Sequence, residues 1–544
     1  MTAAELLVKC LEAEGVRYVF GVPGEENEDL LFALDSSAIR FIPTRHEQGA
    51  AFMADVWGRL TGSAGVCLST LGPGATNLVT GVADAFLDKS PLVAITGQAG
   101  RARIHHESHQ SIDTLALFRP ITKWSASVST PDTVPEIVRK AFKIAESEKP
   151  GATHIELPED VAGLPASGAP IAPVRVRRPD PDTQAVAQAA ALLGKAKRPL
   201  IIAGNGAVRK PATATQLREL VARHRLPVAH TFMGQGAISD DSPHSLCTIG
   251  FAFRDLVMDA VDEADVVLAV GYDLAEYAPR AWNPRNEKTI IHVDFTPADV
   301  DAFYQPAVEL VADIAASLRA LQQELGPQPL ASDSSWSASV RRRILDDIRS
   351  YDLKDGERFT VPGVLNVLRA VMGEEDLLLS DVGAHKLWIA RNFPVACPNG
   401  CLMSNGLASM GIALPGAVAA ALHDPGRRIV AAMGDGGFLM NSQELETAKR
   451  LGTAFTVVIF NDNDYGLISW KQRRARGRAT GTGLTNPDFR AYAESFGIRG
   501  YRPATLAELR WDLAEAVRSR ALAVVEIPVD AGINDRLLCA GQQD

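Results

Sequence analysis

Short apolar runs alternate with helix-period segments along the whole chain. Residues 66–70, 91–96 and 154–157, then 199–203, 266–270 and 289–293, and finally 377–380, 429–433, 455–460 and 523–527 have the composition of buried strands. Intervening segments such as 75–87 carry apolar residues at helical spacing. Strands that alternate with helices predict parallel sheets covered on both faces. The expected fold class is therefore α/β, with three doubly wound parallel-sheet domains.

Two proline-containing segments divide this pattern. Residues 164–182 contain five prolines and residues 326–335 contain two, and neither segment has hydrophobic periodicity. A chain of 544 residues is too long for one core at roughly 150 residues per domain. The predicted domains are residues 1–165, 185–326 and 337–530.

Charge and composition exclude several kinds of partner. The net charge of −10 has no basic stripe to offset it, since the densest basic run, residues 471–478, is local. The chain starts in an amphipathic helix without a leader pattern, and no apolar run reaches the ~20 residues that span a bilayer. Six scattered cysteines suggest reduced thiols. We expect a cytoplasmic protein without disulfides and with no nucleic-acid or membrane partner.

Acidic residues follow two of the expected strands in the last domain. Asp435 lies between Gly434 and the pair Gly436 and Gly437, and Asp462 follows the run 455–460. The carboxyl ends of neighbouring parallel strands border a ligand crevice, so the two acids should converge. Two oxygen ligands beside glycine N–H groups suit a magnesium ion that holds a diphosphate. The alternative is two ordinary acids at strand ends.

The helix between these strands has its own expected start and end. Asn441 and Glu444 are spaced as an N-cap and capping-box pair, and Gly452 follows as the exit.

Glu47 stands directly before a helix of small residues and allows two interpretations. As a helix-start carboxylate it would face solvent, where the helix dipole favours it. As a buried carboxyl it could exchange a proton with a ring nitrogen.

These features together carry a resemblance. With Glu47 and Asp435, the turns Gly21-Val22-Pro23-Gly24 and Leu71-Gly72-Pro73-Gly74-Ala75-Thr76-Asn77 make the chain resemble the thiamin-diphosphate-dependent decarboxylases and carboligases. Within them it is most similar to acetolactate synthase, from Leu6 to about Pro528. The resemblance implies an aminopyrimidine-binding domain, a central domain and a diphosphate-binding domain, in that order.

The resemblance also implies roles for individual residues. Glu47 would hydrogen-bond the aminopyrimidine of the cofactor, and Met410 would wedge the cofactor into its bent shape. Asp435 and Asp462 would bind Mg²⁺ through their side chains, and Asp464 through its backbone carbonyl. The implied cofactor contacts are Gly24, Pro73, Asn77, Gly383, His385, Met410, Gly434, Gly436, Gly437 and Tyr465.

The central domain contains Gly204-Asn205-Gly206, a weak dinucleotide signal because Arg209 replaces the third glycine. Biosynthetic members of the family bind FAD here through an Arg-Phe-Asp-Asp-Arg signature. This chain has instead the six residues from Tyr272 to Tyr277, and it has Asp462 where those members carry Asn. Both differences resemble the FAD-independent catabolic branch, so FAD is not expected.

The residues that would select substrate are Gln110, Ile468 and Lys471, by the same resemblance. Lys471 replaces Trp or Gln of related enzymes and could pair with the carboxylate of a 2-oxo acid, although a solvated lysine is the commoner case. The run from His105 to His109 lacks the glutamate of a zinc protease helix. We interpret it as a polar rim of the pocket.

The expected function is decarboxylation of pyruvate or a similar 2-oxo acid, with transfer of the two-carbon unit to a second carbonyl to give 2-acetolactate. A homodimer or homotetramer with active sites at the subunit interface is expected from the family. Alternatives are another thiamin-diphosphate-dependent 2-oxo acid decarboxylase, an aldehyde carboligase or a sulfoacetaldehyde-type acetyltransferase. A non-catalytic cofactor-binding partner is remote, because Glu47, Asp435 and Asp462 are all present.

Overall fold

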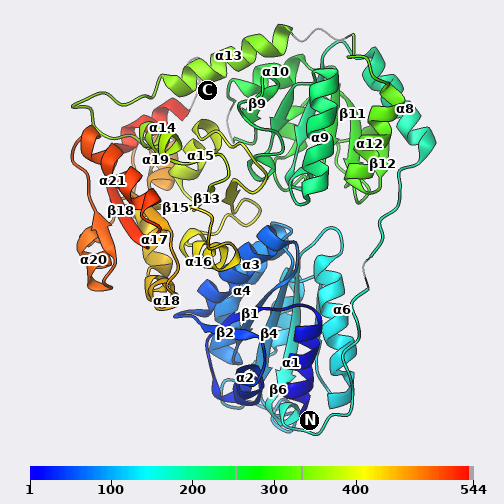
Figure 1. The fold of residues 1–544 in the computed structure, drawn as a ribbon, viewed down its shortest axis with the longest axis vertical. Coiled ribbons are helices and arrows are strands. Elements are labelled where there is room, and N and C mark those ends of the chain that lie inside the picture. The colour runs from blue at the N-terminus through cyan, green and yellow to red at the C-terminus, as the bar shows by residue number, and fades with distance from the viewer. Residues whose placement is uncertain (175, 252–253, 332–334, 538–544) are drawn as a thin grey trace. The chain divides into compact units, whose positions relative to one another are not determined.

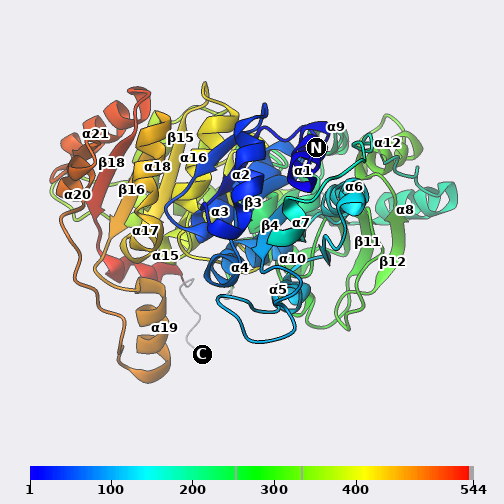
Figure 2. The same cartoon turned by 90° about the horizontal axis from the view of Figure 1, so that it is seen from below.

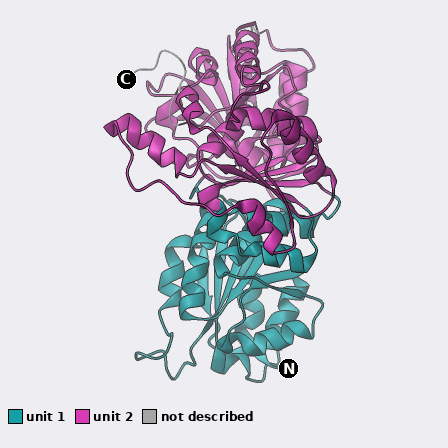
Figure 3. Ribbon diagram, turned by 90° about the vertical axis from the view of Figure 1, so that its left-hand side faces the viewer, with its two compact units in different colours: residues 1–176, 406–426, 438–454 teal, residues 177–405, 427–437, 455–544 magenta. Residues whose placement is uncertain are grey.

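The computed structural model describes residues 1–174, 176–251, 254–331 and 335–537 (Figure 1). They form two compact units (Figure 3). The first unit contains Met1–Val176, Gly406–Gly426 and Phe438–Ala454, and the second contains Arg177–Asn405, Arg427–Gly437 and Phe455–Asp544.

The first unit contains a six-stranded parallel sheet in the order β2-β1-β3-β4-β6-β5. Val66 and Leu68, two positions apart in β3, point to the same face of the sheet, where they share a core with α1, α2 and α6. Helices α3 and α4 pack on each other, and the buried Arg59 of α3 pairs with Asp84 and Asp88 at the end of α4. The elements are α1 (Ala3–Ala13), β1 (Tyr18–Gly21), α2 (Glu28–Asp35), β2 (Arg40–Pro43), α3 (Glu47–Thr61), β3 (Gly65–Ser69), α4 (Gly72–Leu87), β4 (Leu92–Gln98), α5 (Thr114–Phe118), β5 (Trp124–Ser127), α6 (Val134–Glu146), β6 (Ala152–Pro158) and α7 (Glu159–Ala162).

The second unit contains a parallel sheet in the order β12-β11-β10-β7-β8-β9. Ile201 and Leu268 pack with α8, α9 and α12, which flank β11 and β12 in Figure 1. Their neighbours Leu200 and Val267 pack with α10 and α13, so both faces of the sheet are covered. The elements are α8 (Thr183–Lys195), β7 (Pro199–Ala203), α9 (Pro211–His224), β8 (Val228–His230), β9 (Ser245–Thr248), α10 (Val257–Glu263), β10 (Val266–Val270), α11 (Pro279–Trp282), β11 (Thr289–Asp294), β12 (Pro306–Val311), α12 (Ile314–Leu325) and α13 (Ser335–Arg349).

A further parallel sheet of this unit has the order β14-β13-β15-β16-β18-β17, and Figure 2 shows β15, β16 and β18. Leu378, Val458 and Val525 share a core with α14, α15 and α21. Helices α16 and α18 belong to the first unit, where α16 packs against α3. The elements are α14 (Val361–Val371), β13 (Leu377–Ser380), α15 (Ala384–Asn392), β14 (Cys401–Met403), α16 (Ala413–His423), β15 (Ile429–Gly434), α17 (Asp435–Asn441), α18 (Glu444–Leu451), β16 (Thr456–Asn461), α19 (Gly466–Arg476), α20 (Phe489–Ser495), β17 (Arg499–Tyr501), α21 (Leu506–Arg518) and β18 (Ala523–Pro528).

The three parallel sheets confirm the predicted α/β fold class. Each apolar run expected to be a strand is one, and the runs at 199–203, 266–270 and 377–380 have the predicted bounds. The division into domains 1–165, 185–326 and 337–530 stays a proposal.

The predicted capping box of Asn441 and Glu444 is wrong. The connection between β15 and β16 forms two helices, and the N-cap of α18 is Gln443, which makes no side-chain cap bond. Asn441 donates instead to the carbonyl of Gly411, and Glu444 accepts hydrogen bonds from the backbone before α3. Both side chains thus bond to residues distant in sequence instead of to the N-terminal backbone of their own helix. Gly452 does end α18, in the left-handed conformation with φ 67°.

Two further expectations concern membranes and thiols. Within the described ranges, every helix is too short or too polar to span a bilayer. Cys10, Cys67, Cys247, Cys397 and Cys401 are free and buried. Cys539 lies outside the described residues.

Candidate cofactor site

In the first unit, glycines bring the turns after β1 and β3 into contact. A Cβ atom at Gly24 would lie 2.4 Å from the Cβ of Thr70, and one at Gly21 would lie 2.3 Å from the carbonyl oxygen of Leu68. Any larger residue would force the turns apart. The turn after β3 leads into α4, with Pro73 exposed in its first turn.

Glu47 is buried, so its interpretation as a solvent-facing helix-start carboxylate is wrong. Its side chain follows β2 at the first position of α3, and the residue is 8% exposed. Asn77 Nδ2 donates to Glu47 Oε2 at 2.9 Å. A Cβ at Gly74 would lie 3.3 Å from Glu47 Oε1. The carboxylate is therefore held against the first turns of α4.

Gln110 lies on the loop after β4, with its backbone against the same turn. It has a left-handed φ of 57°, and a Cβ at Gly72 would lie 2.4 Å from its carbonyl oxygen. The structure thus brings Gln110 beside the turn that carries Pro73, with its side chain exposed.

The histidines at 105, 106 and 109 are exposed on turns rather than on a helix. The ring centroids of His105 and His106 lie 4.3 Å apart. Across the described parts of the chain, no group of three His, Cys, Asp or Glu side chains is arranged to hold a metal. The predicted magnesium site needs only two carboxylates and a carbonyl.

Met410 lies in a turn with unusual backbone angles. Ala408 has φ 58° and Gly411 has φ 92°, both left-handed. Asn441 Nδ2 donates to the Gly411 carbonyl at 3.0 Å and so holds the turn in place. Because a left-handed alanine costs energy, the conformation is specified by this surrounding structure. Met410 itself is half-buried.

In the second unit, polar residues follow three neighbouring strands, β13, β15 and β16. His385 is buried in the first turn of α15 after β13, against Gly383 and Gly434. A Cβ at Gly434 would lie 3.2 Å from His385 Cε1. Burial lowers the pKa of His385 to about 4, so its ring is neutral. Its Nε2 is buried and has no hydrogen-bond partner among the residues described.

Asp435 and Asp462 converge as predicted. Asp435 Oδ1 accepts from the Gly436 N–H at 3.0 Å. Burial raises the pKa of Asp435. Burial, followed by the charge of Asp435, raises the pKa of Asp462 to about 7. Asp435 is buried and Asp462 is half-buried, and two carboxyls that disfavour each other's ionisation form a site that a divalent cation would stabilise.

The loop after β16 shapes the second carboxylate. Asp464 N–H donates to Asp462 Oδ1 at 3.1 Å. A Cβ at Gly466 would lie 2.3 Å from Asp462 Oδ2, so only glycine fits there. The ring of Tyr465 lies on Gly436, where a Cβ would be 2.7 Å from Tyr465 Cε1. Together with His385 Nε2, which lacks a hydrogen-bond partner within the described part of the chain, these residues fit a magnesium ion and a diphosphate. Gly437 follows in the buried start of α17.

Asn486 is a site residue that the sequence analysis missed. Its Nδ2 lies 2.6 Å from Asp435 Oδ2, 3.1 Å from Asn461 Oδ1 and 3.2 Å from Asn463 Oδ1. It comes from the loop before α20, and no local motif distinguishes it.

Helix α19 presents the predicted selectivity residues. Ile468 is 50% exposed and Lys471 is exposed, three positions further along the helix. Trp470 faces inward, and its Nε1 donates to Asp535 Oδ1 at 2.9 Å. Asp535 lies in the 3₁₀ segment Ala531–Leu537.

The glycine turn of the central sheet is occupied by a side chain of the protein itself. Asn205 N–H donates to Glu276 Oε1 and Oε2 at 2.9 and 3.1 Å, and Thr231 Oγ1 also donates to this carboxyl group. Burial raises the pKa of Glu276 to about 8. A Cβ at Gly204 would lie 2.5 Å from the Gly271 carbonyl oxygen, so the turn is closely packed.

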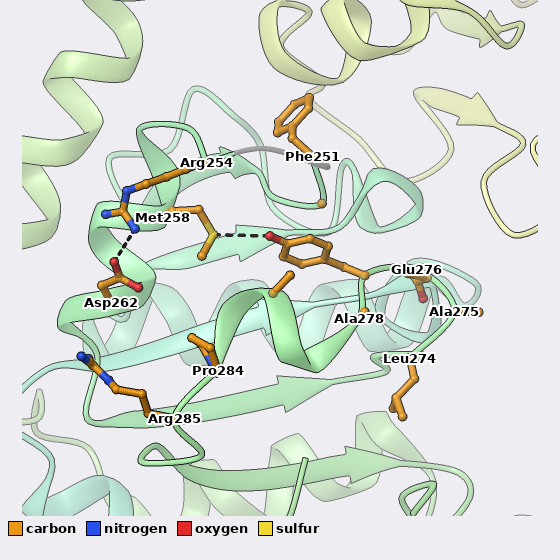
Figure 4. A pocket seen from close by; sticks show the side chains of 13 residues that line it. Phe251, Arg254, Met258, Asp262, Leu274, Ala275, Glu276, Ala278, Pro284 and Arg285 are labelled. Atoms are coloured by element: carbon orange, nitrogen blue, oxygen red, sulfur yellow. Dashed lines mark hydrogen bonds and ion pairs between the residues drawn. The ribbon is translucent and has the colours of Figure 1, made fainter. Parts of the chain in front are cut away.

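Glu276 is also one of the residues that line a cavity of about 680 Å³ (Figure 4). Phe251, Met258 and Leu274 contribute apolar walls. Arg254 at its edge is paired with Asp262, as the dashed line in Figure 4 shows.

Comparisons with known proteins place the chain in a family. The family descriptions "Thiamine pyrophosphate enzyme, N-terminal TPP binding domain", "central domain" and "C-terminal TPP binding domain" match residues 1–117, 186–321 and 381–527. The chain is 35% identical to "Acetolactate synthase" of Bacillus subtilis, over 98% of this chain and 94% of the relative. It is 37% identical to "Acetolactate synthase, catabolic" of Raoultella terrigena, over 98% and 96%. It is 35% identical to "Acetolactate synthase isozyme 2 large subunit" of Escherichia coli, over 92% and 90%. The chain belongs to the acetolactate synthase family of thiamine pyrophosphate enzymes.

Proposed function

We propose that this protein is a thiamin-diphosphate-dependent acetolactate synthase, which decarboxylates pyruvate and joins its two-carbon unit to a second pyruvate. The observation that carries the proposal is that Asn486 contacts both Asp435 and the residues on either side of Asp462, Asn461 and Asn463, in a chain that aligns with these enzymes over nearly its full length.

Asp435, Asp462 and the Asp464 carbonyl would hold Mg²⁺, and Mg²⁺ would hold the diphosphate. The N–H groups of Gly436 and Gly437 and the neutral His385 ring would contact the phosphate oxygens. Asn486 donates to Asp435 and so orients it for the metal.

Glu47 would exchange a proton with a ring nitrogen of the aminopyrimidine, and Asn77 would keep its carboxylate aimed there. The Met410 turn would set the bend of the cofactor. When bound, thiamin diphosphate supplies the nucleophilic carbon and the electron sink for loss of CO2.

Gln110, Ile468 and Lys471 would bind the 2-oxo acid and its acceptor. The Lys471 ammonium suits a carboxylate, which both pyruvate molecules carry. The family alternatives that differ only in the acceptor remain the second candidates, because they share every cofactor residue.

We further propose that the central domain holds no FAD. The Glu276 carboxyl group occupies the N–H of Asn205 in the glycine turn, the position at which a dinucleotide phosphate would be expected to bind. The test is to denature the purified protein and to measure the flavin that it releases. We expect none, and one flavin per chain would contradict the proposal.

A homodimer or homotetramer with shared active sites is the proposed assembly, and a cytoplasmic location stays a prediction. Mixing the inactive variants Glu47→Gln and Asp435→Ala, under conditions that exchange subunits, tests the shared site. Recovered activity supports a site built from both subunits, and no recovery contradicts it.

The function itself is tested by an omission series. Pyruvate consumption should need both Mg²⁺ and thiamin diphosphate, and it should be lost in Glu47→Gln. Consumption without added or retained cofactor would contradict the proposal.

A further inference from the structure

Glu444 is a buried carboxylate that the proposed chemistry does not use. It lies at the first position of α18 and is 0% exposed. Its Oε1 accepts from the N–H groups of Arg45 and His46 at 3.0 and 3.1 Å. Its Oε2 accepts from Thr447 Oγ1 at 2.6 Å. All these residues belong to the first unit.

The two amides that bind Glu444 directly precede Glu47. They lie outside α3, so its helical hydrogen bonds do not engage them. Glu444 therefore fixes the two residues that lead into Glu47, while Asn77 fixes the Glu47 side chain. The carboxylate also lies at the N-terminal end of α3, where the helix dipole favours a negative charge.

Gly49 makes this contact possible. A Cβ at Gly49 would lie 2.8 Å from Glu444 Oε1, so the glycine leaves room for the carboxylate beside α3. Glu446, two positions along the same helix, has a different environment. It is partly exposed, and it pairs with the side chains of Arg450 and Arg45 at 3.0 and 4.0 Å.

We propose that Glu444 is a positioning residue for Glu47, which sets where α3 begins and so where the Glu47 carboxyl group meets the aminopyrimidine. The inference rests on the proposed function, since it needs Glu47 to exchange a proton with the cofactor. Geometry is enough to matter, because a 1 Å misplacement of a reacting group can cost on the order of 100-fold in rate.

The test measures hydrogen–deuterium exchange at the thiazolium C2 of saturating thiamin diphosphate with Mg²⁺, by quenched-flow NMR. Glu444→Ala should slow this exchange by about ten- to hundred-fold. Glu444→Gln should restore it to within about threefold, because the amide oxygen can still accept both N–H groups. Glu446→Gln is the matched control and should behave as wild type.

A second readout needs no cofactor. In the apoprotein, backbone amide exchange of the peptide that contains Arg45 and His46 should be faster in Glu444→Ala and unchanged in Glu444→Gln. Gly49→Ala should also expose these amides and slow C2 exchange, because its methyl group displaces the Glu444 carboxylate. This variant decides the question if Glu444→Ala does not fold.

Wild-type C2 exchange in both Glu444→Ala and Gly49→Ala would overturn the inference, as would equal slowing in Glu446→Gln. Glu47→Gln distinguishes the role of Glu444 from the role of Glu47. Slow exchange in Glu47→Gln with normal exchange in both Glu444→Ala and Gly49→Ala removes only the role of Glu444. Normal exchange in Glu47→Gln removes the proposed role of Glu47 as well.

Discussion

Single neutral side chains orient the acids of this site. Asn77 donates to Glu47, and Asn486 donates to Asp435. An amide can hold a carboxylate in place without neutralising its charge, so the acid keeps its ability to bind a proton or a metal.

Asn77→Ala should lower kcat by about tenfold, because the Glu47 carboxylate loses the donor that aims it. Steady-state kinetics with pyruvate at saturating cofactor measure this loss. The neighbouring Thr76→Ala removes a hydroxyl of the same helix that donates to the Pro73 carbonyl instead of to Glu47, and it should leave kcat unchanged. Equal kinetics in Asn77→Ala and wild type would contradict the proposed contact.

Asp435→Ala should raise the Kd for thiamin diphosphate by about 100-fold at fixed Mg²⁺, since the diphosphate loses a metal ligand. Titration of the intrinsic fluorescence with cofactor measures this change. Asp464→Ala should shift the Kd by no more than about threefold, because the proposed ligand is its backbone carbonyl. A wild-type Kd in Asp435→Ala would refute the metal site.

Sequence patterns located the candidate residues of the site but not the contacts that hold them. Asp435, Asp462 and Glu47 stand at strand and helix ends that a linear pattern can locate. The partners Asn486, Glu276 and Glu444 lie 51, 71 and 399 residues from the groups they hold. No local propensity encodes such pairs, and the local spacing of Asn441 and Glu444 therefore predicts a capping box that the fold does not form.

At the level of elements, buried strands were predictable and short ones were not. Runs such as Val266–Val270 are apolar throughout because both faces of the sheet are covered. Strands β8, β14 and β17 are only three residues long, too short for a periodic signal. Their place in the sheets comes from pairing with longer neighbours.

The segment Ala531–Leu537 forms hydrogen bonds with helices α15 and α19. Asn534 Oδ1 accepts from Trp388 Nε1 of α15 at 2.8 Å, and Asp535 Oδ1 accepts from Trp470 Nε1 of α19 at 2.9 Å. Helix α15 carries His385, and α19 carries Lys471. This segment therefore supports the proposed diphosphate and substrate residues together.

Asp535→Ala should raise the KM for pyruvate roughly fivefold, the effect of about 1 kcal/mol from one hydrogen bond that steadies α19. Asp535→Asn keeps the acceptor oxygen and should retain the wild-type KM. Initial-rate kinetics of the two variants measure this difference in KM. Equal KM values for both would contradict a supporting role of Asp535.

For the whole molecule, Glu276 links folding stability to pH. Its pKa rises from 4.5 to about 8 on burial, so the folded protein keeps a proton that the unfolded chain has lost across this window. Unfolding then releases a proton, and stability falls as the pH rises from 4.5 to 8.

Glu276→Gln removes this dependence, since a glutamine does not titrate. The Tm of the variant relative to wild type should therefore increase by a few degrees between pH 5 and pH 8. Differential scanning calorimetry at both pH values measures the change, with the exposed Glu287→Gln as control. A constant difference in Tm across this range would contradict the buried, protonated state of Glu276.

As an acetolactate synthase, this chain should convert pyruvate to acetolactate. The most direct measurement is ¹³C NMR of the products formed from labelled pyruvate with Mg²⁺, thiamin diphosphate and the purified protein. We predict acetolactate and CO2 in matching amounts. Acetaldehyde in place of acetolactate, or no consumption by protein that binds the cofactor, would contradict the account.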